Sequence, residues 1–129
     1  MRSFFLVLLA SLVLTGCASS GRLSKFDLTA RAYERAVRWS DFQKAFALTA
    51  EPDAAVPDFA ALQQFQVTSY DIVNAARPNE DAMQVTQVVE ISYVNRSRMA
   101  ERRLVDRQLW VYSPSDDRWK LKSAFPVFR

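Results

Sequence analysis

The N-terminal half of the chain carries the hydrophobic spacing of amphipathic helices. From residue 24 to about residue 39, apolar side chains recur at helical spacing on one face, and charged side chains lie opposite. Ser24 and Asp27 resemble a capping box and predict the start of this helix. A second such signal at Ser40 predicts another helix that ends before Pro52, because proline disfavours helical backbone in the residue before it. Pro57 predicts a short third helix that ends near residue 62.

After residue 64 the hydrophobic period changes to that of strands. Four segments are rich in β-branched and aromatic residues and are separated by turn-forming residues: 65–76, 82–94, 103–112 and 118–124. Helices followed by sequential strands with short connections predict an α+β domain. We expect two or three N-terminal helices packed on a curved four-stranded antiparallel sheet.

The register of the last hairpin decides which tryptophan is buried. If Tyr112 pairs with Arg118, Trp119 and Leu121 share one face of the sheet with Leu109 and Val111. Trp110 then lies on the opposite face with Lys120 and Lys122. This register predicts that Trp119 contributes more to stability than Trp110.

The first twenty residues follow a different pattern. A short basic lead precedes the apolar run 4–14, and small residues follow it, as in a secretory signal peptide. As a helix this run would span only about 16 Å, and a hydrocarbon core is about 30 Å thick. Leu14-Thr15-Gly16-Cys17 resembles the lipobox of bacterial lipoproteins. The resemblance implies cleavage before Cys17, a diacylglyceryl thioether on its sulfur and an acyl chain on its new amino group.

These signals divide the chain into three parts. We expect a signal peptide over residues 1–16, the lipidated cysteine with a short tether over 17–23, and one domain over 24–129. Ala18 rather than Asp follows the cysteine, which by the same resemblance favours the outer membrane of a two-membrane bacterium. The sequence therefore predicts a lipid-anchored protein that faces the periplasm and carries covalent lipid but no other cofactor.

Composition excludes several kinds of chemistry. The chain has no histidine, and its single cysteine is the expected lipidation site. Ser-His-Asp and Cys-His nucleophile systems and His/Cys zinc sites are therefore excluded, and the aspartates lack the spacing of a calcium-binding loop. An enzyme would depend on a carboxylate such as Asp71, Glu90 or Asp106, so we expect a protein that is not an enzyme. A net charge of +3 is too small to indicate a nucleic-acid partner.

The order of elements is similar to that of the nuclear transport factor 2-like superfamily. The resemblance covers about residues 24–125 and is carried by the helix break in WSDFQKAFAL, the short third helix and the final hairpin DRQLWVYSPSDDRWKLKSA. It implies a cone-like domain in which a bent sheet wraps around the helices. No signature of the superfamily's enzymes aligns, so no catalytic residue follows from it.

Two groups of side chains are candidates for binding. The open end of such a cone is the expected place for a ligand, and the aromatic residues that would line it are Tyr33, Phe42, Phe65, Tyr93 and Trp110. The alternative is that these residues form the core. Five arginines would contact anionic headgroups, lipopolysaccharide phosphates or an acidic partner, unless they form an ordinary solvated face: Arg96, Arg98, Arg102, Arg103 and Arg107. We expect a binding or accessory module for another envelope component, and the alternatives are an apolar-ligand-binding domain and, less favoured, a carboxylate-dependent enzyme.

Overall fold

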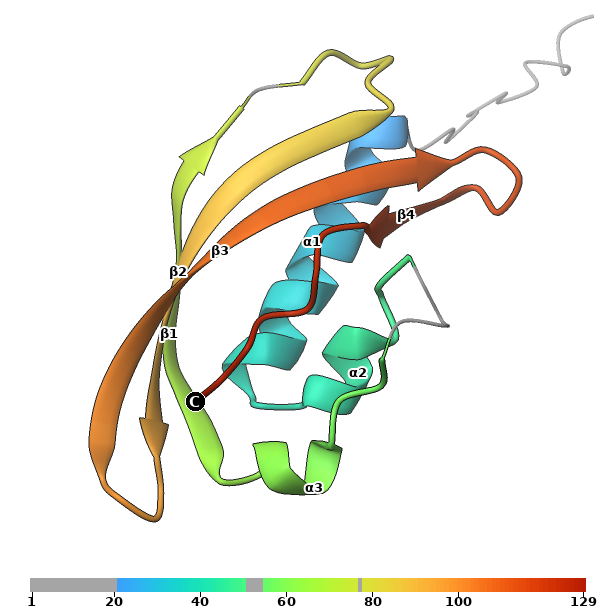
Figure 1. Cartoon of the computed structure of the whole chain (residues 1–129). Coiled ribbons are helices and arrows are strands. Elements are labelled where there is room, and N and C mark those ends of the chain that lie inside the picture. Colours follow the sequence, from blue (N-terminus) through green and yellow to red (C-terminus); the bar gives the residue numbers. More distant parts are fainter. Residues whose placement is uncertain (1–20, 51–54, 77) are drawn as a thin grey trace, which may run out of the picture.

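The computed structural model describes residues 21–50, 55–76 and 78–129. Three helices come first: α1 (Arg22–Arg38), α2 (Phe42–Phe46) and α3 (Phe59–Leu62). Four strands follow: β1 (Phe65–Ala75), β2 (Gln84–Asn95), β3 (Ala100–Ser113) and β4 (Arg118–Leu121). They form one antiparallel sheet in the order β1-β2-β3-β4, and the helices lie on one side of it (Figure 1). The predicted α+β class and four sequential antiparallel strands are confirmed.

The helices begin at different residues from those predicted. Helix α1 begins at Arg22 after the N-cap Gly21 and has no side-chain cap, so Ser24 lies within its first turn. Asp41, and not Ser40, caps α2, because its carboxylate accepts a hydrogen bond from the backbone N–H of Lys44 at 3.1 Å. Asp58 caps α3 in the same way, and Pro57 precedes the cap.

Ser40 has a different role from the predicted one. Its backbone adopts a φ of 57°, which ends α1, and its hydroxyl accepts a hydrogen bond from the backbone N–H of Val67 in β1 at 2.9 Å. A residue with positive φ does not continue a helix. Ser40 therefore separates α1 from α2 and connects the break to the sheet.

Helix α2 ends at Phe46, earlier than predicted, because the residues after it pair with the last strand. Thr49 forms a parallel bridge with Leu121. The backbone N–H of Ala50 donates to the carbonyl of Leu121 at 2.8 Å, and the N–H of Leu121 donates to the carbonyl of Leu48 at 3.0 Å. These bonds satisfy backbone groups at the edge of β4 that would otherwise be exposed.

The register of the last hairpin differs by one residue from the predicted one. Ser113 pairs with Arg118, and Trp110 pairs with Leu121. Residues directly opposite each other lie on the same face of an antiparallel pair, so Trp110 shares the buried face with Trp119 and Leu121. The predicted grouping of Trp119 with Leu109 and Val111 is therefore wrong. Both faces of β3 carry apolar residues here, and the turn that ends at Asp117, with a φ of 52°, sets the register.

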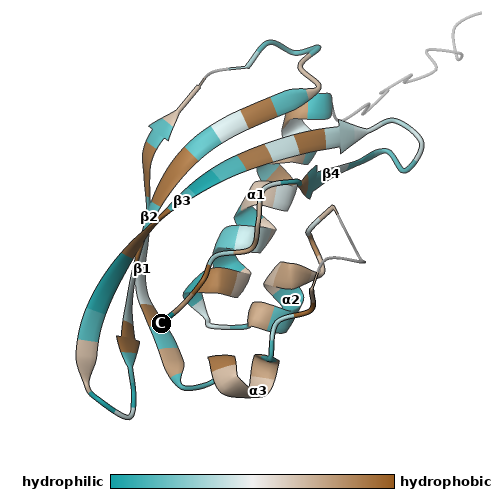
Figure 2. Cartoon of the chain, in the orientation of Figure 1, coloured by the Kyte–Doolittle hydropathy of each residue, from teal (hydrophilic) through white to brown (hydrophobic). Residues whose placement is uncertain are grey.

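The core consists mainly of aromatic side chains between the sheet and α1. Figure 2 shows hydrophobic and hydrophilic residues alternating along β2 and β3, as expected for strands with one buried face. The ring of Phe26 meets the rings of Trp119 and Trp110 edge-on at centroid distances of 5.2 and 6.0 Å. Tyr33 meets Trp110 at 5.5 Å. Offset and edge-on contacts of this kind add about 0.5–1.5 kcal/mol each beyond the burial of area.

The segment 122–129 leaves β4 and runs along the helices toward β1 without forming a helix or strand (Figure 1). Phe128 attaches it to the domain, with its ring 4.7 Å from that of Phe42 and 5.1 Å from that of Tyr93. The hydroxyl of Tyr93 lies 3.2 Å from both the backbone N–H and the carbonyl of Arg129. We call residues 122–129 the C-terminal segment.

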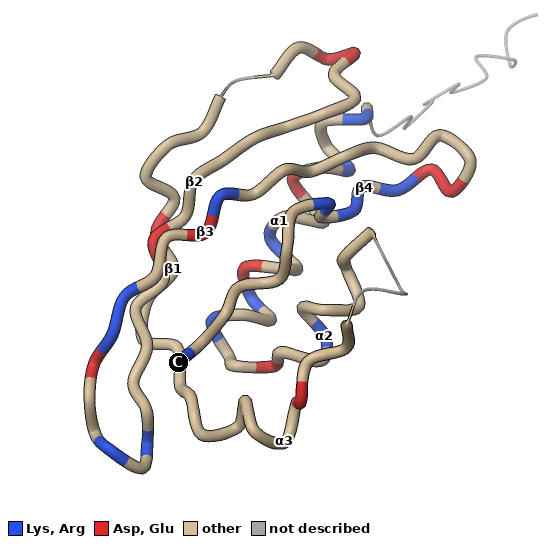
Figure 3. Tube along the Cα trace, viewed as in Figure 1, with Lys and Arg blue, Asp and Glu red and all other residues tan. Residues whose placement is uncertain are grey.

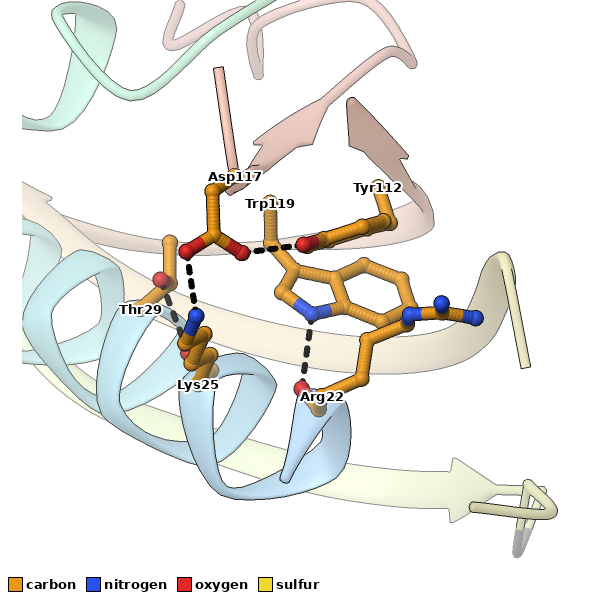
Figure 4. A network of polar contacts seen from close by, with 6 residues as sticks. All are labelled: Arg22, Lys25, Thr29, Tyr112, Asp117 and Trp119. Atoms are coloured by element: carbon orange, nitrogen blue, oxygen red, sulfur yellow. Dashed lines mark hydrogen bonds and ion pairs between the residues drawn. The ribbon is translucent and has the colours of Figure 1, made fainter. Parts of the chain in front are cut away.

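The start of α1 is attached to the last hairpin (Figure 4). The indole N–H of Trp119 donates to the carbonyl of Arg22 at 2.8 Å, and the guanidinium of Arg22 lies 4.8 Å from the ring centroid of Tyr112. Asp117 accepts hydrogen bonds from Lys25 and from the hydroxyl of Tyr112. These contacts join the first turn of α1 to the turn between β3 and β4.

Candidate functional site

The predicted pocket aromatics lie in the core. All five are buried, and Tyr33 and Trp110 have no exposed surface. Phe65 borders a small hollow at the surface, whereas Tyr33, Phe42, Tyr93 and Trp110 line neither of the two hollows described below. The pocket-lining prediction is corrected for these four residues, because α1 and the C-terminal segment fill the space against the sheet. Their alternative role, as core residues, is the one the structure supports.

The five arginines do not form one surface. Arg96 and Arg98 lie in the turn between β2 and β3, and Arg102 is opposite Tyr93 on the helix side of the sheet. Arg103 and Arg107 lie on the other side, opposite Ser92 and Val88. Figure 3 shows the turn between β2 and β3 at the end of the sheet that is distant from the start of α1.

One of these arginines is already paired. The Nη1 atom of Arg103 lies 3.0 Å from Oε1 of Glu90 on the neighbouring strand. A pair this exposed contributes little to stability, but it reduces the positive charge of that face. Contact of the arginines with an anionic surface stays a prediction, and it now applies to separate groups rather than to one patch.

An apolar cavity lies outside the core, between the helices and the C-terminal segment. Its volume is about 550 Å³. The wall is formed by Phe46 of α2, Leu62 of α3, Pro57 before α3 and the consecutive residues 121–128. Thr49, Lys122 and Ser123 supply the polar groups of the wall. Pockets that bind small ligands have volumes of about 300–1,000 Å³ and walls of this mainly apolar kind.

A second hollow adjoins the apolar cavity. Its volume is about 370 Å³, and it shares Pro57, Leu62 and Phe128 with the larger one. Two arginines, Arg98 and Arg129, border it together with the polar side chains of Asp58, Gln64 and Asn95. The combined site therefore has one part beside the C-terminal segment and another beside the β2–β3 turn, where the two arginines lie.

One sequence feature relates to this cavity, but hydrophobic spacing alone does not show where it packs. Phe125-Pro126-Val127-Phe128 is an apolar run directly after the last predicted strand. Such a run has no predictable partner, because proline prevents it from continuing the ladder. Of the ten residues predicted from the sequence as candidates for binding, Arg98 and Phe65 border the combined site.

A buried polar cluster lies on the helix side of the sheet. The amide nitrogen of Gln108 donates to the hydroxyl of Tyr70 at 2.9 Å and to Oδ2 of Asp106 at 2.8 Å. Its carbonyl oxygen accepts from Nε2 of Gln87 at 2.7 Å and from the indole N–H of Trp110 at 3.1 Å. Gln108 therefore uses all four of its hydrogen-bonding positions.

Asp106 has a carboxyl group in a buried environment, which disfavours its charged form. It is 6% exposed and forms no ion pair with the described residues. Burial raises the pKa of its carboxyl, and the hydrogen bond from Gln108 offsets part of that effect. Burial also raises the pKa of the nearby tyrosines Tyr33 and Tyr70. Neither hollow is lined by Asp106, so we interpret the cluster as structural.

The two other candidate carboxylates lie on the far side of the sheet. Asp71 is exposed on β1, and Glu90 is half-buried on β2 directly opposite it. Glu90 is paired with Arg103, as described above. Neither of them borders the two hollows.

The substitution Asp106→Asn is expected to stabilise the domain at neutral pH. The folded state holds the Asp106 proton more tightly than the unfolded state does, so the free energy of unfolding falls as pH rises from about 4 through the raised pKa and stays lower above it. Asparagine carries no charge, so the free energy of unfolding of the variant does not fall in this way as pH rises. Urea unfolding over a pH series measures the difference. Asp71→Asn, on the exposed part of β1, is the control; an unchanged pH profile in Asp106→Asn would contradict the assignment.

The expected lipid anchor lies outside the described residues. This holds for the signal peptide 1–16, for Cys17 and for most of the predicted tether. Arg22 and Leu23 of the predicted tether belong to α1 instead. No helix in the part of the chain that the structure describes is long and apolar enough to cross a membrane. Among residues 21–50, 55–76 and 78–129, no three acidic side chains are grouped so that they could hold a metal ion.

Comparisons with known proteins do not assign the chain to a family. No family model, no curated protein and no solved structure matches it.

Proposed function

We propose that this protein is a lipid-anchored module of the bacterial envelope that faces the periplasm and binds an apolar group of another envelope component. The observation that carries the proposal is the cavity of about 550 Å³ between α2, α3 and the C-terminal segment. Removing apolar surface from water contributes about 25 cal/mol per Å², so an apolar group that fills this cavity gains affinity without any specific polar contact.

The anchor rests on the lipobox at Cys17, and the fold is compatible with it. The stretch 18–21 between the cysteine and α1 reaches at most about 14 Å when extended, at 3.3–3.6 Å per residue. The first turn of α1 is attached to the β3–β4 turn. A lipid on Cys17 would therefore keep this end of the domain close to the membrane. Two or three acyl chains provide durable attachment.

The resemblance to nuclear transport factor 2-like domains is part of the proposal. The helix and strand order agrees with it. The cone-like shape that it implies remains an expectation, and the proposed ligand site lies beside the helices rather than inside a cone.

Cys17→Ser is expected to abolish lipid attachment, because serine lacks the thiol that forms the thioether. Metabolic labelling of the producing cells with a palmitate analogue should mark the wild-type protein and not the variant. Ser11→Ala, within the expected signal peptide, is the control and should label normally. Equal labelling of wild type and Cys17→Ser would overturn the anchor.

Val127→Asp is expected to prevent apolar binding, since it places a charge in the cavity wall. Val127 is 64% exposed, so the substitution has little effect on the core. The lipidated protein in nanodiscs is irradiated with decanol that carries a diazirine, and mass spectrometry locates the labelled residues. Val105→Asp, 57% exposed and outside both hollows, is the matched control. Labelling of residues 121–128 in wild type and Val105→Asp, and its loss in Val127→Asp, supports the function. No labelling of these residues in wild type would refute it.

A further inference from the structure

The end of the combined site beside the β2–β3 turn is bordered by two cationic side chains. Arg98 and Arg129 border the smaller hollow, which shares the side chains of Leu62 and Phe128 with the apolar cavity. Neither guanidinium forms an ion pair with a described residue. These two cations therefore lie at the end beside the β2–β3 turn, and a third cationic side chain, Lys122, lines the apolar cavity.

The acidic residue on the same wall does not neutralise this charge by pairing. The carboxylate of Asp58 caps α3, where its Oδ1 accepts a hydrogen bond from the backbone N–H of Ala61 at 3.1 Å. Two guanidinium groups and one side-chain carboxylate of the described residues border the smaller hollow.

Arg98 lies in a turn whose backbone is held by hydrogen bonds. The side-chain oxygen of the buried Asn95 accepts from the backbone N–H groups of Ser97 at 2.9 Å and Arg98 at 3.3 Å. The N–H of Met99 donates to the carbonyl of Asn95 at 2.8 Å, and Met99 adopts a φ of 51°. These bonds fix the backbone from which the Arg98 side chain extends, so the turn itself loses little entropy on binding.

We propose that the ligand is a single-chain amphiphile with an anionic head group. Its apolar chain lies in the cavity beside Phe125 and Val127, and its carboxylate or phosphate binds Arg98 and Arg129. This inference rests on the proposed function and adds the chemical class of the ligand's head group. A guanidinium matches the planar geometry of a carboxylate or phosphate with two parallel hydrogen bonds.

Competition against the diazirine-labelled decanol tests the head group. Decanoate, decyl phosphate and decanol are added to the lipidated wild-type protein in nanodiscs, and the concentration that halves labelling of residues 121–128 is measured for each. We expect the two anions to compete about tenfold more strongly than decanol, because a hydrogen bond to a charged group contributes more than one to a neutral group. Stronger competition by decanoate would indicate a fatty acid, and stronger competition by decyl phosphate would indicate a phospholipid-derived ligand.

Two neighbouring arginines provide a matched pair of variants. Arg98→Gln is expected to remove most of the advantage of the anions and to leave competition by decanol unchanged. Arg96→Gln, in the same turn but outside both hollows, should behave as wild type. Lys122 borders the apolar cavity but not the smaller hollow, so Lys122→Gln should also retain the advantage.

The outcomes separate this inference from the proposed function. If decanol labels the cavity but the anions have no advantage, or if Arg96→Gln or Lys122→Gln removes it instead of Arg98→Gln, the head-group assignment is wrong and apolar binding stands. If the wild-type cavity is not labelled at all, both proposals are wrong.

Discussion

Trp110→Ala is expected to lower the free energy of unfolding by about 3–5 kcal/mol, the usual cost of truncating a buried tryptophan. The side chain has no exposed surface and packs edge-on against Phe26 and Tyr33. Its indole N–H also donates to Gln108. The total stability of a domain of this size is about 5–15 kcal/mol, so the variant should melt at a much lower temperature or fail to fold.

Urea unfolding followed by circular dichroism measures the effect. Trp39→Ala is the control, because Trp39 is 80% exposed and its loss should change stability by no more than about 0.5 kcal/mol. Trp119→Ala should be destabilising to a similar extent as Trp110→Ala, since both tryptophans lie on the buried face. A Trp110→Ala variant as stable as Trp39→Ala would show that the register of the last hairpin is wrong.

The second large effect is expected at Phe128. Phe128→Ala removes the ring that contacts Phe42, Phe65 and Tyr93, and such a truncation costs about 3–5 kcal/mol when the site is buried. Most of this cost is expected locally, as detachment of the C-terminal segment, because beyond Ser123 the segment forms no backbone-to-backbone hydrogen bond with a strand of the described residues. Since this segment forms most of the wall of the apolar cavity, labelling by the decanol probe should be lost as well.

Trypsin provides a local measurement, because Lys122 is exposed at the start of the C-terminal segment. Cleavage after Lys122 should be much faster in Phe128→Ala than in wild type. Phe128→Leu keeps most of the apolar volume and should restore slow cleavage. Val127→Ala, at an exposed position of the same segment, should leave the cleavage rate unchanged. Equal rates in wild type and Phe128→Ala would mean that Phe128 does not hold the segment in place.

The strands were the most predictable elements. The segments 65–76 and 82–94 agree with β1 and β2 within two residues at each end. The helix starts were less predictable, because several residues with suitable side chains stand next to each other. Ser40 and Asp41 are both good caps, and the choice between them was decided by Val67, which is distant in sequence and uses the Ser40 hydroxyl.

The candidate site was mostly beyond the reach of the sequence pattern. Aromatic residues are suited both to a pocket wall and to a core, so only the packing of α1 against the sheet assigned Tyr33 and Trp110 to the core. In the sequence, Gln87 and Gln108 are typical of the solvent-facing polar positions of strands. They are buried because they lie opposite each other on β2 and β3 and form a hydrogen bond.

The sequence by itself determined the α+β class and the order of the elements, and it predicted a lipid anchor at Cys17, because each of these depends on residues close together in the chain. The tertiary structure alone decided the register of the last hairpin, the division of the arginines between two faces, and the cavity formed with the C-terminal segment. These features depend on which distant residues meet. A shift of one residue in a strand exchanges its two faces, and the hydrophobic pattern does not choose between them where both faces carry apolar residues.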